Sequence, residues 1–150
     1  MSESPRIQPS QADIDFLSQH TTITPKFSLE NKCVVGKCVY VYDGDTVHVV
    51  FRIPNLNDQA FKWVMRLTGI DTPEMKSKNP AEKAAAVRAR DYLRGEILDK
   101  IVVVECGEFD KYGRLLGNIY INDVCMNTRM IELGHAKVYD GGTKAGWADV

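Results

Sequence analysis

The chain has 150 residues, a formal net charge of −1 and four cysteines, with 44% hydrophobic and 26% charged residues. This composition is ordinary for a globular domain that buries a core without disulfides, and it excludes a disordered chain, a coiled coil or a repeat array. No apolar run approaches the roughly 20 residues of a membrane span, so we expect no membrane segment. The near-neutral charge excludes a protein that coats nucleic acid by bulk electrostatics but leaves room for a local phosphate site.

The N-terminal residues 1–6 lack the basic and apolar regions of a secretory signal, so we expect an intracellular protein. Its cysteines are then expected to be reduced thiols. Cys33 and Cys38 lie five positions apart on an expected strand and so point to opposite faces, which argues against a shared metal site. Nothing in the sequence demands a protein partner, and we expect a monomer.

Residues 1–32 are predicted to form an N-terminal arm, and residues 33–150 the domain that follows it. The arm is polar and contains three prolines, which fits a mobile segment. Within it, Ser10 can cap a short helix. Part of the arm is nevertheless expected to dock on the domain, because it carries apolar residues: Ile14, Phe16, Leu17, Ile23 and Phe27.

Five segments rich in β-branched or aromatic residues predict strands, and helix signals follow the third and the fifth. Asn79 and Pro80 begin the first helix, which Gly95 is expected to weaken or end, and Gly134 closes the second, over residues 126–133. The order β-β-β-α-β-β-α predicts an α+β, mainly β domain: a five-stranded oligonucleotide/oligosaccharide-binding (OB) barrel with two flanking helices. The predicted strands cover residues 33–42, 46–53, 59–68, 100–106 and 112–121.

Acidic and arginine residues gather in three clusters at strand ends or in loops, where a rigid scaffold presents functional side chains. Each cluster alone is explained by turn or helix-approach chemistry. Together they contain the parts that attack on a phosphodiester requires: hard carboxylate ligands for Ca²⁺ or Mg²⁺, forked arginine donors for phosphate, and a further acid to activate water. The clusters are Asp43-Gly44-Asp45-Thr46, then Arg66 with Asp71-Thr72-Pro73-Glu74, then Asp110-Lys111-Tyr112-Gly113-Arg114.

With these three clusters in this order, residues 35–138 resemble staphylococcal nuclease, the thermonuclease family. A later stretch, from Asn127 to Val138, is similar to the family's second helix and its exit. The resemblance implies the family's OB-fold barrel and a Ca²⁺-dependent phosphodiesterase that acts on DNA and RNA and leaves 3′-phosphate ends. The implied cofactor is Ca²⁺, and the implied partner is a nucleic-acid substrate.

The resemblance also implies which residues bind the metal and activate water. Asp45 and Asp71 would bind Ca²⁺ through their carboxylates, and Thr72 would bind it through its backbone carbonyl. Glu74 would be the general base that activates the attacking water.

The remaining roles implied by the resemblance concern the phosphate and the nucleotide. Arg66 and Arg114 would stabilise the pentacoordinate phosphate, and Arg114 would also assist the leaving group. Lys111 and Tyr112 would contact the terminal phosphate of a bound nucleotide. Tyr139 would take one place of the family's pair of nucleotide-stacking tyrosines.

The chain departs from the family after Tyr139. The family continues into a long third helix, whereas residues 140–150 are few and rich in glycine. We expect another part of the chain to cover the surface that this helix would protect. The candidates are Ile14, Leu17 and Phe27 of the arm, or Trp147.

Two questions stay open at this point. Residues 76–94 hold six basic and two acidic side chains, which predicts either a solvated helix face or a rail for a nucleic-acid backbone. The rival to an enzyme is a non-catalytic OB-fold module that binds nucleic acid or protein through the same groove. The intact set of acids favours the enzyme, because a pure binder gains nothing from carboxylates that face phosphates. A small nucleotide is a third possible ligand.

Overall fold

The computed structural model describes residues 6–144, 146 and 147, and in this part of the chain it contains three helices and eight strands. None of these helices combines the length and hydropathy needed to cross a membrane. The elements in chain order are α1 (Gln11–Leu17), β1 (Cys33–Val41), β2 (Thr46–Arg52), β3 (Ala60–Leu67), β4 (Ile70–Asp71), α2 (Pro80–Ile97), β5 (Ile101–Phe109), β6 (Leu115–Ile121), β7 (Val124–Cys125), α3 (Met126–Glu132) and β8 (Lys137–Val138).

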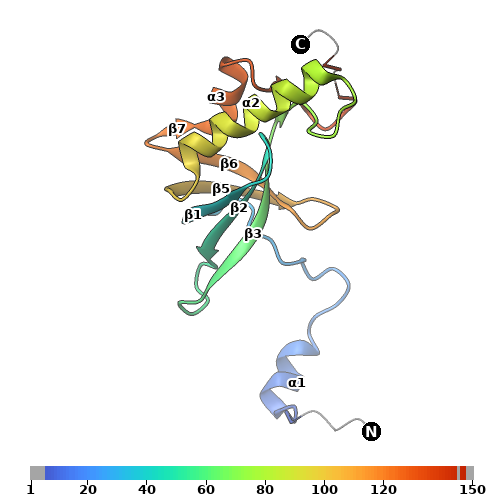
Figure 1. Cartoon of the computed structure of the whole chain (residues 1–150). Coiled ribbons are helices and arrows are strands. Elements are labelled where there is room, and N and C mark those ends of the chain that lie inside the picture. The colour runs from blue at the N-terminus through green and yellow to red at the C-terminus, as the bar shows by residue number, and fades with distance from the viewer. Residues whose placement is uncertain (1–5, 145, 148–150) are drawn as a thin grey trace, which may run out of the picture.

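Five of these strands form a closed barrel (Figure 1). The strand order is β3-β2-β1-β5-β6, all antiparallel, and a parallel pairing of β3 with β6 joins the two ends. This closure confirms the predicted OB-type barrel. β5 continues to Phe109, three residues beyond the prediction, because a register shift after Cys106 lets it keep pairing with β6.

The core fills the interior of the barrel through the two-residue alternation of its strands. Val47, Val49 and Phe51 of β2 are buried, while the residues between them are half-exposed. Gly117 lies on β6 where that strand contacts both β5 and β3. A Cβ atom at this position would lie 2.5 Å from the backbone oxygen of Glu105, so any side chain would force the strands apart.

Helix α2 crosses one end of the barrel, with α3 beside it (Figure 1). Asn79 caps α2 as predicted, since its Oδ1 accepts a hydrogen bond from the backbone N–H of Ala81. The expectation that Gly95 ends this helix is wrong, because α2 runs on to Ile97. Ile97 is fully buried, and burying it offsets the roughly 1 kcal/mol that a glycine costs inside a helix.

The arm touches the barrel only near its end in the described part of the chain. α1 is capped by Ser10, as predicted, but lies apart from the barrel in Figure 1, with Ile14 and Leu17 exposed. Phe27 is also exposed and meets the ring of Phe109. The expectation that Ile14 and Leu17 cover part of the domain is therefore wrong, because both side chains are exposed, while Phe27 meets Phe109. The boundary of the arm at residue 32 stays a prediction.

Two short strands close the chain over the barrel. β4 pairs with β8, so that Ile70 lies opposite Val138 and Asp71 opposite Lys137. Beyond β8 the chain turns back, and Trp147 is buried with 7% of its surface exposed. Of the residues named from the sequence as possible cover, Trp147 is buried, and its indole contacts Asp71. All four cysteines are free thiols, with Cys33 exposed and Cys38 buried, as their separation on β1 predicted.

Candidate active site

The turn between β1 and β2 places the first acid, Asp45. Oδ1 of Asp43 accepts hydrogen bonds from the backbone N–H groups of Asp45 and Thr46, at 3.1 and 2.9 Å. Gly44 lets this turn approach α2, because a Cβ there would lie 2.9 Å from the Thr72 methyl carbon and 3.0 Å from Cβ of Ala89. The turn therefore sits tightly against the segment that carries the next acid, and Asp45 is buried.

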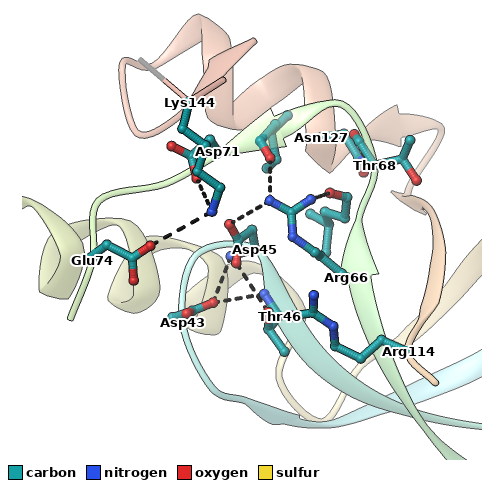
Figure 2. Close-up of polar contacts among 12 residues, drawn as sticks. Asp43, Asp45, Thr46, Arg66, Thr68, Asp71, Glu74, Arg114, Asn127 and Lys144 are labelled. Atoms are coloured by element: carbon teal, nitrogen blue, oxygen red, sulfur yellow. Dashed lines mark hydrogen bonds and ion pairs between the residues drawn. The ribbon is translucent and has the colours of Figure 1, made fainter. Parts of the chain in front are cut away.

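Arg66 reaches Asp45 from the neighbouring strand. It lies directly opposite Thr46 in the pairing of β2 with β3, and its Nη2 lies 3.6 Å from Oδ2 of Asp45. The same guanidinium donates to the backbone oxygens of Leu67, at 3.4 Å, and Ile70, at 3.1 Å. Arg66 thus ties the turn between β3 and β4 to Asp45 in the turn before β2 (Figure 2).

Asp71, on β4, is the most enclosed acid of the site. Its Oδ2 accepts a hydrogen bond from the indole Nε1 of Trp147, at 3.3 Å. Its Oδ1 is buried and has no hydrogen bond, although the ammonium of Lys144 lies 3.2 Å away. A buried carboxylate oxygen without a hydrogen bond is uncommon and marks a position where a cation fits.

Glu74 lies at the open side of the site, and 64% of its side chain is exposed. Its backbone N–H donates to Oε2 of Glu82 on α2, at 3.0 Å, which ties the loop to the first turn of the helix. Its own Oε1 lies 3.9 Å from Nζ of Lys144 (Figure 2). Among the described acids that line the smaller cavity, Glu74 is the most exposed.

The turn between β5 and β6 places Arg114. Oδ1 of Asp110 accepts from the backbone N–H groups of Tyr112 and Arg114, both at 2.9 Å, and Oδ2 accepts from Nε of Arg114, at 2.7 Å. Burial acts to raise the pKa of Asp110, but these hydrogen bonds and the guanidinium charge outweigh it and lower the pKa overall. Asp110 therefore stays ionised and holds Arg114 in place at neutral pH.

Two adjoining cavities collect the predicted site residues. One, of about 270 Å³, is lined by Asp45, Thr72 and Glu74. The other, of about 650 Å³, is lined by residues that include Lys111, Tyr112 and Tyr139. Three cationic residues line both cavities: Arg66, Arg114 and Lys144. With Asp71 beside Lys144, the structure brings all nine predicted residues to one surface, while their roles stay predictions.

Three acids line the smaller cavity beside the three cations, and two of these acids, Asp43 and Asp45, affect each other. Burial raises the pKa of Asp43 to about 7, and the negative charge of Asp45 adds to this rise. In the absence of a metal ion, Asp43 is therefore partly protonated at neutral pH.

Among the described residues, no group of three His, Cys, Asp or Glu side chains is arranged as a ready metal cluster. The metal set expected from the sequence contains only two carboxylates, with a backbone carbonyl as the third donor.

Several supporting residues were not predicted to belong to the site. Glu82, Lys144 and Trp147 contact the predicted acids directly. Asn127 is buried on α3 and bridges three backbone groups. Its Oδ1 accepts from the N–H of Ile119, at 3.1 Å, and its Nδ2 donates to the backbone oxygens of Thr68 and Gly117, at 2.9 and 3.1 Å. The sequence signal for Asn127 was its place in the stretch from Asn127 to Val138, which is similar to the second helix of the family and its exit.

Replacing Asn127 with alanine is expected to lower the free energy of unfolding by about 2–4 kcal/mol, because the Ile119 N–H and the Thr68 oxygen would lose a partner and the Gly117 oxygen would keep the Thr68 N–H. Urea unfolding followed by circular dichroism measures this change. Asn118, whose amide donates to the exposed Glu105, offers the control. Asn118→Ala is expected to cost less than about 1 kcal/mol, and equal losses in the two variants would contradict the buried role.

The sequence model of the family described as "Staphylococcal nuclease homologue" matches residues 64–146, more than half of the chain. The chain belongs to this family. The match includes both arginines of the site and the acids on β4 and in the following loop. The first acidic turn, with Asp45, lies outside the matched segment, 19 residues before its start, yet the structure places Asp45 against Arg66 of that segment.

Three relatives show how the family resemblance extends across organisms. An uncharacterised protein of Methanocaldococcus jannaschii is 34% identical over 69% of this chain and 58% of its own length. A protein of Escherichia coli named an uncharacterised endonuclease is 32% identical over 70% and 61%. A probable endonuclease of Colletotrichum graminicola is 25% identical over 77% and 50%. The chain thus spans only about half to three fifths of the length of these staphylococcal nuclease relatives.

Proposed function

We propose that this chain is a Ca²⁺-dependent nuclease that hydrolyses phosphodiester bonds of DNA or RNA and leaves 3′-phosphate ends. The observation that supports this proposal is the meeting of acids and arginines from distant elements around one small cavity. The relatives named as endonucleases agree with it. No structural requirement of the barrel accounts for this set, because two buried acids and an arginine cost desolvation energy that apolar residues would avoid.

The donors at the smaller cavity fit a hard divalent cation. The buried oxygen Oδ1 of Asp71 has no hydrogen bond, and Asp45, which lines the cavity, is a second buried carboxylate. We expect these two carboxylates and the backbone carbonyl of Thr72 to hold the metal. Oxygen donors of this kind suit Ca²⁺ and Mg²⁺ rather than zinc. A bound cation would neutralise charge on the phosphate and would lower the raised pKa of Asp43.

In the proposed reaction, water attacks phosphorus in line with the bond to the 5′ oxygen. The exposed carboxylate of Glu74 orients this water and accepts its proton. Arg66 and Arg114 stabilise the negative charge that builds on the phosphate oxygens. The bond to the 5′ oxygen breaks, Arg114 assists that oxygen as it leaves, and the products are a 3′-phosphate and a 5′-hydroxyl.

The larger cavity is proposed to hold the nucleotide next to the cleaved bond. Lys111 and Tyr112 stand at its rim, with Nζ of Lys111 lying 5.2 Å from the centre of the Tyr112 ring. Tyr139 also lines this cavity, and the guanidinium carbon of Arg66 is 5.5 Å from its ring centre. Aromatic faces next to cations suit a base and its phosphate, since bases stack on rings and phosphates pair with cations.

Cleavage of labelled single-stranded and double-stranded DNA and of RNA tests the proposal, in Ca²⁺ and in excess chelator. We expect cutting only with the metal, and 3′-phosphate ends on the fragments. Asp45→Asn should lower the rate by at least roughly 100-fold, because the variant loses a charged donor. A folded protein that cuts nothing in Ca²⁺, Mg²⁺ or Mn²⁺, yet binds single strands equally well in chelator, would instead be the non-catalytic binding module.

A further inference from the structure

The segment that follows β8 passes directly over the acidic cavity. It is anchored at its start, where the N–H of Tyr139 donates to the backbone oxygen of Gly69, at 2.8 Å. It is anchored again at Trp147, whose indole donates to Asp71 and whose ring lies 4.5 Å from Nζ of Lys137. Between these two anchors the segment places one ammonium group, that of Lys144, over the acids (Figure 2).

Lys144 occupies the position where a cation is most needed. Its Nζ lies 3.2 Å from the buried Oδ1 of Asp71 and 3.9 Å from Oε1 of Glu74. Oδ1 of Asp71 has no hydrogen bond, so among the described residues the ammonium of Lys144 is the group that balances its negative charge. At such distances, beside a carboxylate that is almost fully buried, two opposite charges attract far more strongly than they do in water.

The lysine can leave this position without unfolding the segment. Its side chain is 46% exposed, and a flexible four-carbon stem lets the ammonium swing into solvent while Tyr139 and Trp147 stay anchored. A divalent ion carries twice the charge and accepts several oxygen donors at once. The ammonium and a divalent ion cannot both occupy the space beside Oδ1 of Asp71.

We propose that Lys144 is an internal counter-ion that the metal has to displace, so that the segment from Tyr139 to Trp147 sets the metal affinity of the site. This inference rests on the proposed function, because it concerns the same metal. In the metal-free protein, Lys144 neutralises Asp71 and lies across both cavities. Because the ammonium and the metal compete for one position, whatever weakens the binding of the ammonium there raises the apparent affinity of the metal.

Isothermal titration of the whole chain with Ca²⁺ alone tests the inference. Lys144→Gln removes the competing charge and is expected to lower the Kd for Ca²⁺ at least roughly fivefold. Lys144→Arg keeps a cation and should stay near the wild-type Kd. Lys26→Gln, which removes the same charge from the exposed arm, is the matched control and should change nothing. The unfolding temperature of each variant confirms that it is folded.

A second readout needs no substitution. If the metal displaces Lys144, its ammonium becomes more accessible, and acetylation of Lys144 followed by mass spectrometry should be faster with saturating Ca²⁺ than with chelator. Lys26 should be acetylated equally in both.

The outcomes separate this inference from the proposed function. Calcium binding that Asp71→Asn abolishes, together with an unchanged Kd in Lys144→Gln and unchanged acetylation, would overturn the counter-ion role and leave the nuclease proposal standing. Absence of binding in both the wild type and Lys144→Gln would overturn the metal site and this inference together. Binding that is seen only in Lys144→Gln would support the inference strongly.

Discussion

Replacing Glu74 with glutamine is expected to lower kcat for DNA cleavage by roughly 10²- to 10⁴-fold, because an amide cannot accept the proton of the attacking water. The side chain is 64% exposed and only 3.9 Å from one ammonium, so its removal costs the fold little. The measurement is the single-turnover cleavage rate of a labelled strand at saturating Ca²⁺, with circular dichroism to verify the fold.

The matched control for this variant is Glu30→Gln, which makes the same change at an exposed position before β1. It should keep the wild-type rate. Glu74→Asp keeps the charge but shortens the side chain, and an intermediate rate is expected from it. Full activity in Glu74→Gln would remove the general-base assignment, while calcium binding by the variant would show that the metal site had survived the change.

Replacing Arg114 with lysine is expected to lower kcat by roughly 10²- to 10³-fold, with little change in the Kd for Ca²⁺. Lysine keeps the charge but lacks the planar fork that matches two phosphate oxygens. It also cannot reproduce the hydrogen bond from Nε to Asp110, at 2.7 Å, that orients the guanidinium. The same single-turnover assay measures the loss.

Asp110→Asn tests the position of the Arg114 guanidinium separately from its charge. The variant leaves Arg114 intact but removes the carboxylate that holds it, and a smaller loss in kcat is expected. Because the pKa of Asp110 is lowered in the folded protein, the pair contributes stability at neutral pH and loses it as the pH falls through the lowered pKa. Arg129→Lys, at an exposed pair with Glu132, is the control, and an equal effect there would contradict the special position of Arg114.

The barrel could be predicted because its signals are local. The alternation of Val47, Val49 and Phe51 predicts which face of β2 is buried, and this prediction does not depend on which strand pairs with β2. Asn79 and Pro80 similarly mark the start of α2 within a few residues. Closure followed from the order of the elements, because a helix after the third of five strands is typical of one barrel topology.

The short strands and the arm could not be predicted in the same way. β4 and β8 have two residues each, too few for any periodic pattern, and they pair only because the folded barrel brings them together. The prediction for the arm was wrong for the opposite reason, because a periodic pattern is present but does not lead to packing. Ile14 and Leu17 share a helical face that indicates packing, yet no described part of the barrel covers them.

The residues that gather at the candidate site could be chosen from the sequence, but the contacts of Lys144 and Trp147 could not. Asp45, Asp71 and Arg66 stand in motifs of acids and arginines that single them out, while their roles stay predictions. Lys144 and Trp147 stand in a glycine-rich stretch with no pattern, and the indole of Trp147 meets a carboxylate 76 positions earlier in the chain. A contact across such a separation leaves no local trace. The one available signal was a large aromatic residue in an otherwise polar segment.

The parallel pairing of β3 with β6 makes barrel closure and assembly of the site a single folding event. Met65 to Leu67 pair with Leu115 to Gly117, so Arg66 and Arg114 meet only when segments some fifty positions apart have joined. Such distant, parallel pairings form slowly. The meander of β1, β2 and β3 can form earlier and already holds Asp45 beside Arg66. Under the proposed mechanism, a partly folded chain of this kind has an acid beside an arginine but lacks the second arginine, so we expect it to show no cleavage before the barrel closes.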